Sequence, residues 1–199
     1  MKQTVLRWSG RSMAVGMAAL TSACAGDAPS APYGATTAAP RVAAVASASA
    51  VNQRVDLPAG CEDLAAPVGS PLVLRAFGIG VQIYSWDGTT WQFVAPSATL
   101  YADAGGRGVV ATHFGGPTWV SRSGGSVVGT VAHRCTPDAA SIPWLSLSAT
   151  ADGPGVFEKV KLIQRLNTVG GNAPSTPGTV IGQEVKVPYT ADYLFYQAP

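Results

Sequence analysis

The sequence predicts an all-β domain, either an antiparallel β-sandwich or a barrel-like sheet, with many short strands and hairpins. Three observations support this prediction. Only 12% of the 199 residues are charged, which disfavours long solvated helices. The 23 Gly and 15 Pro residues interrupt the chain at short intervals. Between these interruptions, short apolar runs recur from Val55 to Pro199, a pattern typical of sandwiches and barrels.

Residues 1–24 are typical of an export signal. A cationic start is followed by an uncharged stretch and by small residues that lead to Cys24. The uncharged stretch is too short to span a membrane as a helix. The string Leu20-Thr21-Ser22-Ala23-Cys24 resembles a bacterial lipobox, with Thr21 in the usual Leu position. We expect an exported protein, either lipidated on Cys24 and anchored to the cell-envelope membrane, or cleaved in the ordinary way and secreted.

The basic charge of the chain belongs to this leader. Three of the 13 Lys and Arg residues precede Cys24, namely Lys2, Arg7 and Arg11. The ten that remain face 11 Asp and Glu residues, so the rest of the chain is slightly acidic. A nucleic-acid partner, which requires a basic surface, is therefore not predicted.

Residues 25–54 are predicted to form a disordered linker. They are mostly Ala, Pro, Ser and Thr, with Tyr33 as their one aromatic residue. Such a stretch buries too little apolar surface to offset the chain entropy lost on folding. We expect it to tether a folded domain that spans residues 55–199.

Within this domain the apolar runs predict eleven strands. In chain order they cover residues 72–77, 80–86, 91–95, 98–101, 109–114, 118–121, 126–133, 144–150, 156–166, 184–189 and 193–196. The segment 156–166 also fits helical spacing. The preceding Gly153-Pro154-Gly155 and the β-branched residues of the segment favour a strand.

Two short loops predict tight hairpins. Asp87-Gly88 is a preferred pair for a two-residue turn, which would place Tyr84 opposite Trp91. Gly124-Gly125 predicts a second such turn, which would place Trp119 opposite Thr130.

Cys61 and Cys135 are the two cysteines other than Cys24. In the oxidising compartment reached by export, such a pair is expected to form a disulfide, which would stabilise the fold by roughly 4 kcal/mol in the chain-entropy model. Two separate buried thiols are the alternative.

Five residues are candidates for a ligand site: Tyr84, His113, Trp119, Arg165 and Asn167. His113 precedes Phe114-Gly115-Gly116-Pro117 and could act as a base, bind a ligand, or hydrogen-bond buried backbone where the turn leaves the sheet. Strand alternation would place Arg165 and Asn167 on one face, where aromatic rings such as Tyr84 and Trp119 could stack on a polar small molecule or a glycan. In the alternative, Arg165 pairs with a surface acid and Asn167 enters the following turn.

Other kinds of site have little support in the sequence. No close spacing of metal ligands, no Gly-x-Ser-x-Gly elbow and no Gly-x-Gly-x-x-Gly between a strand and a helix is present, so we predict no metal site, no catalytic residue and no cofactor. Tyr189, Tyr193 and Tyr196 are expected to pack at a sheet edge, with a binding box as the alternative.

Several strings in this order resemble the DUF3455 family of exported bacterial and fungal proteins. They include Gly80-Val81-Gln82-Ile83-Tyr84, His113-Phe114-Gly115-Gly116-Pro117-Thr118-Trp119 and Ile163-Gln164-Arg165-Leu166-Asn167-Thr168-Val169-Gly170-Gly171-Asn172-Ala173-Pro174. The resemblance covers about residues 55–196 and implies no established function. Relatives often carry cysteines where this chain has Ser85-Trp86 and Ser175-Thr176-Pro177, so the resemblance implies that a bridge of theirs is missing here.

Three functions fit these features. The first is a non-catalytic domain of the cell envelope or of a secreted protein that binds a ligand or an envelope component. The second is a structural surface or coat protein without a ligand. The third is a small hydrolase that uses His113 and Arg165. The scarcity of titratable groups argues against the third, because acid–base catalysis needs paired groups with shifted pKa values.

Overall fold

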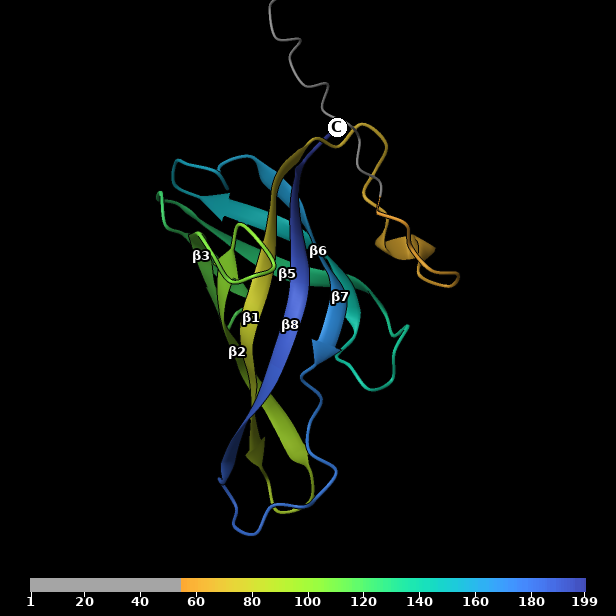
Figure 1. Cartoon of the computed structure of the whole chain (residues 1–199), viewed down its shortest axis with the longest axis vertical. Coiled ribbons are helices and arrows are strands. Elements are labelled where there is room, and N and C mark those ends of the chain that lie inside the picture. The colour runs from red at the N-terminus through yellow and green to blue at the C-terminus, as the bar shows by residue number, and fades with distance from the viewer. Residues whose placement is uncertain (1–54) are drawn as a thin grey trace, which may run out of the picture. The chain divides into compact units, whose positions relative to one another are not determined.

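The computed structural model describes residues 55–199. The predicted export signal at 1–24 with Cys24, and the predicted linker at 25–54, lie outside the described residues. Eight strands, each antiparallel to its neighbours, follow one another around a closed barrel (Figure 1). The all-β prediction is confirmed, and of its two architectures the chain forms the barrel. The strands are β1 (Leu72–Trp86), β2 (Trp91–Tyr101), β3 (Val109–Phe114), β4 (Thr118–Ser121), β5 (Ser126–Cys135), β6 (Trp144–Asp152), β7 (Val160–Gly170) and β8 (Glu184–Gln197).

Three long strands replace six of the predicted short ones. Strands β1, β2 and β8 each join two predicted runs, because the residues between the runs continue the pairing. Gly78 shows the reason in β1. A Cβ on Gly78 would lie 2.6 Å from the ring of Tyr193, so this glycine makes room for an inward-facing tyrosine and does not end the strand. The segment predicted at 156–166 is a strand from Val160, where β7 begins.

The two predicted hairpin registers are wrong. Asp87 Oδ1 accepts hydrogen bonds from the backbone N–H groups of Thr89 (2.7 Å) and Thr90 (2.8 Å), which stabilises a four-residue loop over 87–90. Tyr84 therefore lies opposite Phe93 instead of Trp91. In the β4–β5 hairpin the Ser121 N–H donates to the Gly125 carbonyl (3.0 Å), which leaves three residues, 122–124, in the loop, and Trp119 lies opposite Val127 instead of Thr130.

Alternate side chains of each strand point into the barrel, and one half of the interior is filled. Phe157, from the loop between β6 and β7, is completely buried and packs on Phe195 with ring centroids 4.8 Å apart. Trp119 meets Phe195 edge to face at 6.0 Å. These rings close the barrel at the end where β6 runs into β7.

A second cluster lies outside the barrel, where residues 55–66 cross strands that would otherwise expose apolar side chains. Leu64, at the end of a short 3-10 turn (Glu62–Leu64), packs with Leu166, Leu194 and Tyr196. Gln164 Nε2 donates to the Leu64 carbonyl (2.6 Å), and the Tyr196 hydroxyl donates to Gln164 Oε1 (3.0 Å). Tyr196 thus lies under this crossing segment and not at a sheet edge.

The predicted disulfide between Cys61 and Cys135 is confirmed, with Cα atoms 5.4 Å apart. It ties the crossing segment to the end of β5. Ser85-Trp86 and Ser175-Thr176-Pro177 also lie on neighbouring segments. The Trp91 indole N–H donates to the Thr176 carbonyl (3.0 Å), and a Cβ on Gly178 would lie 2.5 Å from the ring of Trp86.

Among residues 55–199, no helix has the length and apolar character needed to cross a membrane.

Removing the disulfide should loosen the crossing segment. We expect the double variant Cys61→Ser/Cys135→Ser to lose about 2–4 kcal/mol of unfolding free energy, because the unfolded chain gains entropy without the cross-link. Urea unfolding of the oxidised protein and the variant measures the difference. Dithiothreitol should shift the wild-type midpoint and leave that of the variant unchanged. A wild-type midpoint that does not respond to the reductant would contradict the structural role of the bridge.

Candidate functional site

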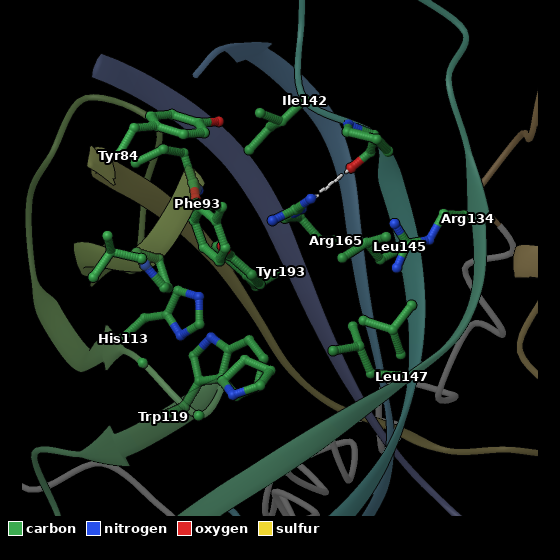
Figure 2. A pocket seen from close by; sticks show the side chains of 18 residues that line it. Tyr84, Phe93, His113, Trp119, Arg134, Ile142, Leu145, Leu147, Arg165 and Tyr193 are labelled. Carbon is green, nitrogen blue, oxygen red and sulfur yellow. Dashed lines mark hydrogen bonds between the residues drawn. The ribbon is translucent and has the colours of Figure 1, made fainter. Parts of the chain in front are cut away.

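The other half of the barrel interior holds an open cavity of about 400 Å³. It lies at the end bounded by the β3–β4 turn (115–117) and the β5–β6 loop (136–143). Its apolar wall includes Phe93, Val131, Ile142, Leu145 and Leu147, and its polar and aromatic residues are Gln82, Tyr84, His113, Trp119, Arg134, Arg165 and Tyr193 (Figure 2). Cavities of this size and lining bind small molecules in other proteins.

Four of the five predicted site residues line this cavity: Tyr84, His113, Trp119 and Arg165. They come from β1, β3, β4 and β7, so only barrel closure brings them together. The Tyr84 hydroxyl donates to the Gly171 carbonyl (2.7 Å), which holds the start of the β7–β8 loop beside the cavity.

Asn167 does not join them, and the prediction that it shares a face with Arg165 is wrong. A register shift separates Leu166 from Val169, and Asn167 adopts a backbone φ of +50°, so strand alternation breaks between Arg165 and Asn167. The Asn167 amide donates to Asp192 Oδ2 (2.9 Å), the oxygen that also pairs with Arg75 (2.8 Å).

His113 is held in one protonation state at the floor of the cavity. Its ring stacks on Trp119 with centroids 4.2 Å apart, and its Nδ1–H donates to the Thr118 carbonyl (2.9 Å). That bond leaves Nε2 as a hydrogen-bond acceptor. Burial, helped by the positive charge of Arg165, lowers the pKa of His113 to about 4 against the opposing effect of the Thr118 bond. His113 is therefore neutral at pH 7, and it makes the backbone hydrogen bond expected of a structural histidine while also lining the cavity.

Arg165 brings a charge into the barrel without a carboxylate beside it. Its Nη2 and Nε donate to the Pro143 carbonyl at 2.8 and 3.3 Å, and Figure 2 shows the guanidinium between Tyr193 and Leu145. No ion pair involving Arg165 is found within residues 55–199, and no Asp or Glu lines the cavity. The surface pairing expected as one alternative for Arg165 is therefore not formed in the described part of the chain.

Sequence reasoning missed Gln82, Arg134 and Tyr193 as cavity residues. The sequence predicts a sheet-edge position for Tyr193, yet Tyr189, Ala191 and Tyr193 alternate in β8 and share its inward face. The Tyr189 and Tyr193 hydroxyls lie 3.0 Å apart, and burial raises the pKa of both phenols. Period-two alternation across the predicted break in β8 was the signal that could have identified them.

Two buried donors at the cavity have no hydrogen-bond partner within residues 55–199. They are the side-chain amide nitrogen of Gln82 and the indole nitrogen of Trp119, whose residues are 2% and 1% exposed. An unpaired buried donor costs about 1–3 kcal/mol, so such groups are uncommon unless a further partner occupies the site. No group of three or more His, Cys, Asp or Glu side chains within residues 55–199 is arranged to hold a metal ion.

Comparison with known proteins gives one family. The family model described as "Protein of unknown function (DUF3455)" matches residues 67–197, which include all eight strands in full. No curated protein and no solved structure matches the chain.

The buried neutral state of His113 predicts acid sensitivity. The folded pKa is lower than the unfolded one, so the unfolded chain binds the additional proton and stability falls as the pH drops from about 6.5 to about 4. We expect this residue to contribute a loss of about 2–3 kcal/mol in unfolding free energy between pH 7 and pH 4.5. Urea unfolding at both values measures it.

His113→Asn is the matched variant, because its amide can still donate to the Thr118 carbonyl but cannot take up a proton. It should be less stable at pH 7, having lost the stacking on Trp119, and should lose less stability on acidification than the wild type. Equal losses in the two proteins would mean that His113 is not held neutral.

Proposed function

The chain belongs to the DUF3455 family of proteins of unknown function, and we propose that it is a non-catalytic binding protein that takes up a small molecule in its barrel cavity. The observation that carries the proposal is the open cavity of about 400 Å³, whose lining residues Gln82 and Trp119 each carry a buried donor without a partner within residues 55–199.

The shape and lining of the cavity support the same function. Eight-stranded barrels are wide enough either to be filled by side chains or to hold one small ligand. Here Phe157, Phe195 and Trp119 fill one half, and the half beyond His113 is left open. Aromatic and aliphatic walls with a few polar groups are typical of sites for amphipathic ligands.

The residues of the cavity favour binding over hydrolysis. Within residues 55–199, no Ser, Thr, Cys, Asp, Glu or Lys lines the cavity, so the described part of the chain places neither a usual nucleophile nor a carboxylate beside His113. The ring Nδ1 of His113 is engaged by Thr118, and its pKa of about 4 makes it a weak base.

The cavity also disfavours a purely structural coat protein. Cavity volume in a core lowers stability, by about 24 cal/mol per Å³ in mutational series, and a protein under selection for stability alone would fill it with larger side chains. Larger residues at Val131 or Leu147 would reach into this space. Valine and leucine at these positions leave that space open.

We propose that the protein acts outside the cytoplasm. The support is the lipobox-like string that ends at Cys24 and the Ala- and Pro-rich stretch that follows it. A lipid on Cys24 and a linker over 25–54 would tether the barrel to a membrane while leaving the cavity accessible.

The binding proposal is tested with N-phenyl-1-naphthylamine, a neutral dye whose fluorescence rises in apolar surroundings. We expect saturable binding to the wild-type protein. Val131→Trp should weaken this binding at least about tenfold, because the indole would occupy the cavity.

Val128→Trp is the matched control, since Val128 lies on the same strand but is 43% exposed on the outer surface. It should bind the dye like the wild type. Circular dichroism establishes that both variants are folded. If both bind the dye equally well, or if the wild type does not bind it, the cavity is not a ligand site.

Lipidation is tested by metabolic labelling in a bacterial host with an alkyne fatty acid. The wild-type chain should incorporate the label and fractionate with membranes, because the thiol of Cys24 would carry the lipid. Cys24→Ser should be unlabelled. An unlabelled wild-type protein released into the medium would show ordinary cleavage and secretion instead.

A further inference from the structure

The charges of the cavity identify the kind of ligand. Its lining includes two cations, Arg134 and Arg165, and no Asp or Glu, although the chain after Cys24 is slightly acidic as a whole. Positive charge is thus concentrated at this site and does not reflect the general composition of the domain. A cationic ligand would meet repulsion here with no compensating carboxylate.

Arg165 retains donors after its contacts within the chain are counted. The Pro143 carbonyl accepts from Nε and one N–H of Nη2, and the guanidinium also interacts with the Tyr193 hydroxyl, which still leaves N–H groups of Arg165 for a ligand. A single backbone carbonyl does not neutralise the charge of a half-buried guanidinium. An anionic group that reached these free N–H groups would form charge-assisted hydrogen bonds in surroundings of low dielectric constant.

The neutral donors of the cavity residues also favour an anionic ligand. The side-chain nitrogen of Gln82 and the indole nitrogen of Trp119 are donors, and both lack partners within residues 55–199. Neutral His113 adds no positive charge at pH 7. The buried part of the site therefore offers one full positive charge and additional neutral donors, which matches an acceptor with a single negative charge.

We propose that the cavity binds a small carboxylic acid with an apolar or aromatic body, in which Arg165 anchors the ionised carboxylate. The body would contact the rings of His113 and Trp119 and the aliphatic wall formed by Leu145 and Leu147. Arg134, which is exposed at the cavity, would attract the anion during approach. This assignment rests on the proposed binding function.

The test is displacement of N-phenyl-1-naphthylamine by two competitors that share one ring system and differ in charge. 1-Naphthoate is ionised at pH 7, and 1-naphthamide is its neutral isostere. We expect 1-naphthoate to displace the dye from the wild-type protein at a concentration at least about tenfold lower than 1-naphthamide requires. Equal potency of the two competitors would overturn the assignment of a carboxylate ligand.

Arg165→Gln should remove this preference while leaving dye binding in place, and Arg165→Lys should retain part of it, because lysine keeps the charge without the planar fork. Arg107→Gln is the control. It changes the net charge equally but lies in the β2–β3 loop at the other end of the barrel, where Arg107 pairs with Asp103. A preference for 1-naphthoate that survives in Arg165→Gln would exclude Arg165 as the anchor.

Two further results separate this inference from the binding function itself. 1-Naphthyl phosphate, which carries a second negative charge, should displace the dye less well than 1-naphthoate, and the opposite order would overturn the single-charge assignment. Failure of the wild-type protein to bind the neutral dye would refute the cavity as a ligand site. Dye binding without any preference for the acid would refute only the ligand class.

Discussion

The antiparallel pairing of β1 with β8 is the constraint on which the rest of the structure depends. It extends from Leu72 opposite Tyr196 to Ser85 opposite Glu184 and turns a meander of eight strands into a closed barrel (Figure 1). Closure removes both sheet edges and gives every strand one inward face. It also requires a residue without a Cβ at position 78, where the ring of Tyr193 passes.

Closure divides the barrel into two chemically different halves. Rings from Phe157 and Phe195 fill one half completely, and the stacked pair of His113 and Trp119 forms the boundary between that half and the cavity. Beyond this boundary lies Arg165, whose positive charge has no ion-pair partner within residues 55–199. The same rings thus stabilise the fold and form the floor of the site, so binding and stability share residues.

Irregularities in the strands decide which polar side chains face the cavity. The register shift in β7 turns Asn167 outward to Asp192, while Arg165 stays inward. Because of the register shift between Ile83 and Tyr84, two residues of β2 lie opposite one residue of β1. As a result, both Phe93 and Val94 line the cavity. Outside the barrel, the disulfide and the bond from Gln164 to Leu64 fix the crossing segment over β6 to β8.

The sequence by itself determined the all-β class, the cysteine pair and four of the cavity residues, because alternation, turn residues and residue chemistry are local properties. It also contained the inward alternation of Tyr189 and Tyr193, which the apparent break in β8 obscured. The tertiary structure alone decided the strand number, the hairpin registers, the outward direction of Asn167 and the absence of an acid beside Arg165 within the described residues. The strand number and the surroundings of Arg165 depend on barrel closure, which brings together segments more than a hundred residues apart, as for Arg75 and Asp192. The hairpin registers depend on hydrogen bonds within the loops, such as those of Asp87.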